Sequence, residues 1–226
     1  AIRQVNKGFF KYNVKLNLDK LRNTLRTTLI DIWEYVIPIW KISGLFKSIK
    51  SKKDLKNFIQ ERSAHVSQTT LYGYLKTRIG VKYIAMMEDE VFLKSINIAK
   101  WNIYVVALAD CAFYVFSYLI SEKNLEKNDC KEIFLNILEN EKKNGLSDEI
   151  FDRGKNNFLK RLDTVNFSNY HLNDPFKESG QALYYWSPIA DELKSLDKKI
   201  VLNSIHLKWG LMKDEFTKLT KNLKFN

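Results

Sequence analysis

Glycine and proline are scarce in this chain of 226 residues, which holds 8 and 3 of them. Together they make up about 5% of the residues, whereas average usage is roughly 12%. A fold of many short strands needs frequent tight turns, and tight turns depend on these two residue types. The sequence therefore argues against a turn-rich all-β protein.

Cysteine is scarce too, since Cys111 and Cys130 are the only two. One lies in an apolar stretch and the other in a polar one, which makes no disulfide framework and indicates a reducing compartment. No stretch combines a basic start, a short apolar run and a small-residue cleavage site, as a secretory signal does. We expect a cytoplasmic protein, or one held peripherally on the inner face of a membrane.

Apolar residues make up 45% of the chain and charged residues 28%, which is the balance of a folded globular protein. Apolar residues recur at helical spacing, and no segment alternates as a strand does. The sequence predicts an all-α, single-domain helical bundle over residues 1–226, with about six to eight helices and a long C-terminal one. We distinguish a basic amphipathic N-terminal segment, residues 1–50, from a helical core, residues 54–226.

The core divides at its few turn signals. The expected elements are a helix from about Asp54 to Arg78, a central helix from Val91 to Ile120, two polar-faced helices within 121–160 and a loop over 164–181. The last helix begins at Ser187, a natural N-cap, with Pro188 in the first helical position. Its apolar residues predict packing against neighbouring helices, with one shift of phase. They are Ile189, Leu193, Leu196 and Ile200, then Ile205, Trp209, Met212, Phe216, Leu219 and Leu223.

The net charge of +11 is unevenly spread, because residues 1–60 carry +9, residues 198–226 carry +5 and those between carry −3. Two basic ends attract anionic surfaces, whether phospholipid or nucleic acid. Lysine outnumbers arginine by 30 to 7, and arginine is the better residue for phosphate, so nucleic acid is disfavoured as a partner. The lysine excess and the 20 asparagines also fit the coding bias of an AT-rich genome, so a merely solvated surface stays open.

The basic N-terminal region holds the candidates for a docking surface. From Leu29 to Phe46 bulky residues recur at helical spacing, and Pro38 should kink or end that helix. An amphipathic helix with tryptophans beside lysines can lie in a membrane interface, but it can equally pack on the protein's own core. The surface-binding candidates are Trp33, Trp40, Lys47, Lys50, Lys52 and Lys53.

Asp110 is the only Asp, Glu, Lys or Arg between Ile103 and Ile120, the most apolar stretch of the chain. This length is borderline for a membrane span, yet a central Asp would cost about 2.5–3.5 kcal/mol there, so a buried core helix fits better. A buried carboxylate needs a partner. The candidates are His65, Lys76, Arg78, Lys100 and the Asn-rich loop over 164–181. Asp110 is then either an acid or base lining a cleft or a polar clip between helices.

His65 and Tyr72 are the other candidates for a catalytic site. They share one stripe of the helix expected over 54–78 with Glu61, Arg62, Gln68, Thr69 and Lys76. Such a stripe is either a solvated or interdomain surface or the wall of a ligand-binding cleft. A catalytic cleft in this protein would lie near Asp110, His65 and Tyr72.

Recognised catalytic motifs are absent from the sequence. It contains no G-x-S-x-G pentapeptide, Walker loop, dinucleotide-binding glycine motif, C-x-x-C or H-E-x-x-H. The three histidines, His65, His171 and His206, lie far apart and predict no metal site. The sequence thus predicts no cofactor and leaves the catalytic residues unassigned.

Three stretches of the chain resemble a known group of proteins. They are Ala64–Arg78 (AHVSQTTLYGYLKTR), Ser95–Trp101 (SINIAKW) and Trp186–Leu193 (WSPIADEL). The chain resembles a group of uncharacterised alphaproteobacterial proteins, some of which carry the label esterase. The resemblance covers the chain from about residue 55 onward and implies a bacterial or mitochondrial protein. It implies no mechanism, and the label finds no nucleophile elbow in this sequence.

Three functions remain as hypotheses. The first is a non-enzymatic helical protein that docks on an anionic membrane surface or a larger protein assembly through its basic N-terminal region. The second is a small-molecule hydrolase with a cleft near Asp110. The third is an RNA-binding or ribosome-associated protein, which the lysine-dominated charge fits less well. The oligomeric state stays open.

Overall fold

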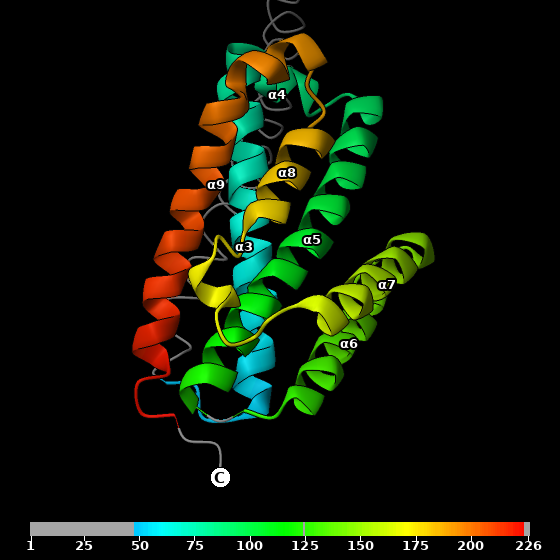
Figure 1. The fold of residues 1–226 in the computed structure, drawn as a ribbon. Coiled ribbons are helices and arrows are strands. Elements are labelled where there is room, and N and C mark those ends of the chain that lie inside the picture. The colour runs from blue at the N-terminus through cyan, green and yellow to red at the C-terminus, as the bar shows by residue number, and fades with distance from the viewer. Residues whose placement is uncertain (1–47, 124, 224–226) are drawn as a thin grey trace, which may run out of the picture. The chain divides into compact units, whose positions relative to one another are not determined.

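A computed structural model describes residues 48–123 and 125–223 of the protein, which belong to one compact unit. In this part the chain is helical and contains no strand (Figure 1). Its six helices of ten residues or more are α3 (Lys52–Ile79), α5 (Glu90–Lys123), α6 (Lys127–Lys143), α7 (Asp148–Thr164), α8 (Lys177–Trp186) and α9 (Asp191–Leu219). A short helix, α4 (Tyr83–Met86), follows a 3-10 turn. The prediction of an all-α bundle with a long C-terminal helix is confirmed.

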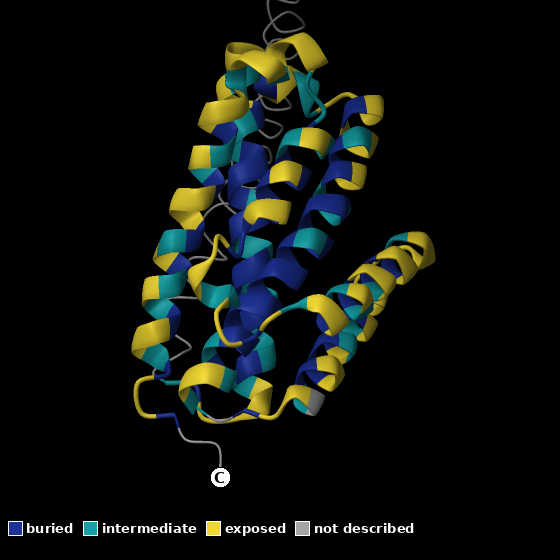
Figure 2. Cartoon of the chain, in the orientation of Figure 1, coloured by how far each residue is buried: buried dark blue, intermediate teal, exposed yellow. Residues whose placement is uncertain are grey.

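Helix α5 lies at the centre of the bundle, where it packs against α3, α6, α7 and α8. Most of its length is buried (Figure 2). By length and composition α5 meets the criteria for a membrane span, and 83% of its most apolar stretch is buried inside the structure. Core helices of globular proteins meet the same criteria, so this burial agrees with the central core helix expected over Ile103–Ile120.

Local capping explains where α3 begins and ends and where α7 begins. The Ser51 hydroxyl accepts a hydrogen bond from the Asp54 amide at 3.1 Å, and Gly80 ends α3 with a φ of 62°, which favours glycine. Ser147 caps α7 in the same way through the Ile150 amide. The helix expected over Asp54–Arg78 and the two expected within 121–160 are therefore present, with boundaries shifted by a few residues.

Two expectations at the C-terminal end are wrong. Part of the loop expected over 164–181 is helix α8, which begins at Lys177. Ser187 does not cap the last helix, because its hydroxyl donates a hydrogen bond to the Leu183 carbonyl of α8 at 2.6 Å. A short turn separates the two helices, so α9 begins at Asp191 and ends at Leu219 instead of near Leu223.

The apolar stripe expected along the last helix is only half correct. The residues of its second part, Ile205, Trp209, Met212 and Phe216, form the buried face of α9. The residues of its first part are largely exposed, at 41% for Leu193, 74% for Leu196 and 69% for Ile200. Val201 continues the buried face in their place, so the packing predicted for the first part of the stripe is wrong.

Candidate functional site

Asp110 is fully buried, and it connects three helices. Its Oδ1 accepts a hydrogen bond from Arg161 Nη2 of α7 at 2.9 Å, and its Oδ2 accepts one from the Ser179 amide of α8 at 2.7 Å. Ser179 lies in the region expected to supply a partner, whereas Arg161 was not among the candidates. Both carboxylate oxygens are therefore engaged, which corresponds to the interpretation of Asp110 as a polar clip.

Arg161 is held in a fixed orientation by this pairing. Its Nη2 also donates to the Tyr170 hydroxyl at 2.7 Å, and that hydroxyl donates to the Pro175 carbonyl at 2.9 Å. Its guanidinium lies 4.6 Å from the ring centroid of Phe113. Asp110, Tyr170 and Phe113 thus hold the guanidinium from three sides. A flexible surface arginine has no such fixed orientation.

Burial raises the pKa of Asp110 to about 6, although the Arg161 guanidinium and the Ser179 amide favour the ionised carboxylate. Burial also raises the pKa of Tyr170, with the negative charge of Asp110 acting in the same direction. At neutral pH Asp110 is mainly a carboxylate and Tyr170 a phenol. The site therefore contains an ion pair, and Tyr170 keeps its proton for the bond to Pro175.

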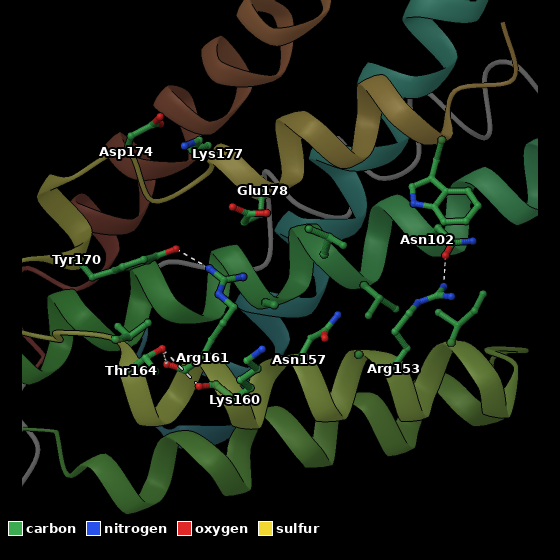
Figure 3. Close-up of a pocket in the computed structure, with 17 residues that line it drawn as sticks. Asn102, Arg153, Asn157, Lys160, Arg161, Thr164, Tyr170, Asp174, Lys177 and Glu178 are labelled. Atoms are coloured by element: carbon green, nitrogen blue, oxygen red, sulfur yellow. Dashed lines mark hydrogen bonds between the residues drawn. The ribbon is translucent and has the colours of Figure 1, made fainter. Parts of the chain in front are cut away.

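A cleft of about 630 Å³ lies beside this network, between α5, α7 and α8 (Figure 3). Val105, Val106, Ala109 and Gly154 form apolar parts of its wall, together with Trp186 at the end of α8. Four cationic side chains line the cleft, against two carboxylates. The cations are Arg153, Lys160, Arg161 and Lys177, and the carboxylates are Asp174 and Glu178.

Several of these cations are free to meet a ligand. Neither Lys160 nor Lys177 forms an ion pair with a carboxylate in the described part of the chain. Arg161 uses only Nη2 in hydrogen bonds with described residues, which leaves its Nε and Nη1. Arg153 donates to the Asn102 side chain and lies over the Trp186 ring at 5.8 Å. Arg153 also forms an ion pair with Glu149 at 3.6 Å, and Arg161 is paired with Asp110. Lys160 and Lys177 are therefore the cations of the cleft without an ion pair among the described residues, and they lie beside an apolar wall.

The other predicted catalytic residues, His65 and Tyr72, are not among the described residues that line this cleft. His65 lies on α3, and its pKa is lowered to about 4 by burial and by the charges of Lys208 and Arg62. Its Nδ1 is buried and has no hydrogen-bond partner among the described residues. Tyr72 is 7% exposed and belongs to the core. None of the three candidates therefore lines the cleft between α5, α7 and α8, and a catalytic site near them stays a prediction.

The docking candidates fall partly outside the described residues. Trp33, Trp40 and Lys47 lie there, and docking through the basic N-terminal region stays a prediction. Lys50 and Lys53 are exposed. Lys52 is 58% exposed and forms an ion pair with Asp129 of α6 at 2.8 Å, so it contributes to the contact between α3 and α6.

A serine–histidine pair that sequence reasoning missed lies at the end of α5. The Ser117 hydroxyl lies 2.8 Å from His171 Nδ1, and it donates to the Phe167 carbonyl at 2.6 Å. Ser117 is fully buried, which keeps its oxygen from a substrate. Ser121 also bonds the Phe167 carbonyl. The polar C-terminal end of α5 therefore bonds to the loop before α8. In the sequence, the only sign of this contact is that the helix face becomes more polar toward its C-terminal end.

Comparison with known proteins gave no match, whether to a family model, a curated protein or a solved structure. The resemblance to alphaproteobacterial proteins stays an expectation from the sequence. Among residues 48–123 and 125–223, no group of three or more His, Cys, Asp or Glu side chains could hold a metal ion. The interpretation of the site therefore depends on its own geometry.

Proposed function

We propose that the protein binds a small amphiphilic anion in the cleft between α5, α7 and α8. The observation that carries this proposal is the fixed Arg161, which Asp110 and Tyr170 orient while its Nε and Nη1 stay available. A guanidinium presents N–H donors in a planar fork that matches a carboxylate or phosphate. Lys160 and Lys177 add positive charge at the same cleft.

The size and lining of the cleft define the rest of the ligand. A volume of about 630 Å³ is in the range of small-molecule sites, which are mostly apolar with a few polar groups that fix orientation. Val105, Val106 and Trp186 offer an apolar wall for the uncharged part of the ligand. We therefore infer a ligand with one anionic group and an apolar or aromatic body.

Binding is favoured over hydrolysis as the role of this site. A hydrolase of the serine type needs an exposed nucleophile beside a base, and Ser117 is buried with its proton donated to a carbonyl. Asp110 is engaged through both oxygens and is not among the residues that line the cleft. The side chains that face the cleft are suited to hold an anion.

Phenyl phosphate is a suitable probe, with benzoate as the carboxylate counterpart and phenol as the neutral control. Titration calorimetry should show binding of an anion, with about a tenfold loss of affinity in the double variant Lys160→Ala, Lys177→Ala. A charge-matched control is Lys131→Ala, Lys143→Ala, because both lysines are exposed on α6 and neither lines the cleft. Equal weakening in the two double variants would show only attraction to the net charge of +11.

A further inference from the structure

A second cavity of about 480 Å³ lies between α3, α5 and α6, and its lining differs in kind from that of the anion cleft. Two carboxylates, Glu61 and Glu141, face one cation, Lys100. Trp101 and Tyr104 supply aromatic rings. Four side-chain amides complete the polar lining: Asn57, Gln60, Gln68 and Asn144. The lining is thus rich in hydrogen-bond acceptors and carries a net negative charge.

Glu141 lines this cavity, and it is only 5% exposed. Its Oε1 accepts hydrogen bonds from the Tyr104 hydroxyl at 2.5 Å and from Gln60 Nε2 at 2.6 Å. Its Oε2 accepts one from Asn144 Nδ2 at 3.1 Å. All three donors are neutral. Glu141 forms no ion pair within the described residues.

A buried carboxylate surrounded by neutral donors is an unusual arrangement. Buried charges in proteins are nearly always paired, because transfer of an unpaired ion out of water is costly. Burial and the charge of Glu141 together raise the pKa of Tyr104 far above its ordinary value, so the phenol stays protonated and donates. Among the described residues Glu141 has no countercharge, and a cationic ligand that enters the cavity would supply one.

We propose that this cavity binds an organic cation, a linear aliphatic polyamine, with one ammonium group placed against Glu141. A second carboxylate, Glu61, lines the same cavity, so its wall is acidic at two residues. The amide oxygens accept the remaining N–H groups. The Trp101 ring already attracts a cation, since Lys100 Nζ lies 5.4 Å from its centroid.

One observation favours an organic cation over a metal ion. A metal ion would need a denser set of ligands, and in the part that the structure describes no group of three or more acidic, histidine or cysteine side chains could hold one. The net charge of +11 repels cations from the molecule as a whole. Binding of a polyamine would therefore report this cavity and not a general attraction to the surface. The proposal does not depend on the anion cleft.

Spermidine is the probe, and titration calorimetry together with tryptophan fluorescence measures its binding to the full chain. The variant Glu141→Gln keeps an acceptor for Tyr104 but removes the charge, and we expect about a tenfold loss of affinity or more. The control is Glu139→Gln, which makes the same charge change at an exposed position of the same helix and should bind as the wild type does. A straight-chain diol of the length of spermidine should not bind.

Lys100→Gln keeps the proposal testable if Glu141→Gln fails to fold. Lys100 lines the cavity and repels a cationic ligand, so its replacement should tighten spermidine binding several-fold. The proposal is overturned if the wild type does not respond to millimolar spermidine at low salt, or if the diol binds equally well. It is also overturned if Lys100→Gln weakens binding, or if Glu139→Gln loses as much affinity as Glu141→Gln.

Discussion

Arg62 shows how much a single pair of residues contributes to this bundle. Its side chain is 2% exposed, and it donates to both oxygens of Glu215, at 2.6 Å from Nε and 2.5 Å from Nη2. Its guanidinium also lies 5.3 Å from the ring centroid of Phe58. The pair connects α3 to α9 near the contact between Phe58 and Phe216. Breaking a buried pair by removal of one partner is far more harmful than loss of a surface pair.

We predict that Glu215→Ala lowers the free energy of unfolding by about 3 kcal/mol, the lower end of the range for buried pairs. The lower end applies because the Glu215 side chain is 36% exposed, so water reaches the pair. The control is Asp214→Ala, an exposed acid one residue away, which should change stability by less than about 0.5 kcal/mol. Urea unfolding measures both. Equal effects of the two variants would mean that the buried pair contributes no more than a surface charge.

At the scale of helices, Gly154 determines how closely α5 and α7 approach. A Cβ atom at this position would lie 2.4 Å from Cγ1 of Val105, which is 5% exposed in the core. At Gly210, inside α9, no described atom outside the adjoining turns of the same helix lies within 4 Å of the corresponding position. The two glycines therefore offer a matched pair in helix interiors, one tightly packed and one open.

Gly154→Ala should destabilise the protein by about 1–3 kcal/mol, because a branched side chain in a packed core must move. Gly210→Ala should instead stabilise it by up to about 1 kcal/mol through the better helix propensity of alanine. Thermal unfolding followed by circular dichroism measures the change of stability in both variants. A gain of stability in both variants would show that α5 and α7 can separate at little cost.

The helices themselves could be predicted from the sequence, because their apolar residues recur at the helical period. The part that failed is the division of 164–223. Ser187 and Pro188 have the pattern of a helix start. In the structure they lie in the turn between α8 and α9, where the Ser187 hydroxyl bonds to the Leu183 carbonyl. The exposed Leu196 and Ile200 have the same spacing as buried residues, and spacing alone cannot tell which stripe faces the core.

For the candidate site, the sequence predicts only that Asp110 needs a partner, and it does not predict which residue that partner is. A carboxylate at Asp110 within an apolar helix must have a partner, and the structure supplies Arg161 and Ser179. Arg161 lies 51 residues away, and no local pattern marks it, because the pairing depends on how α7 crosses α5. The same holds for Glu141 and Tyr104, which meet only when α5 and α6 pack.

For the whole molecule, the buried Asp110 and the half-buried His65 have opposite effects on stability as the pH changes. The pKa of Asp110 is raised from 3.8 to about 6, so its contribution to stability grows as the pH falls through 6 and is lost as the pH rises through it. The pKa of His65 is lowered from 6.5 to about 4, so its contribution is present above 6.5 and is lost as the pH falls toward 4. Burial lowers the pKa of His171 as well, which adds to the loss on acidification.

These opposed contributions partly cancel in the wild type and separate in single variants. Between about pH 7 and pH 4.5, Asp110→Asn should lose stability more steeply than the wild type, because the contribution of Asp110 no longer opposes those of the histidines. His65→Gln should lose less over the same range, or gain. The two slopes should differ by up to about 1.4 kcal/mol per pH unit for each proton concerned. Urea unfolding at several pH values measures the slopes, and parallel curves for the three proteins would show that neither group changes its proton affinity on folding.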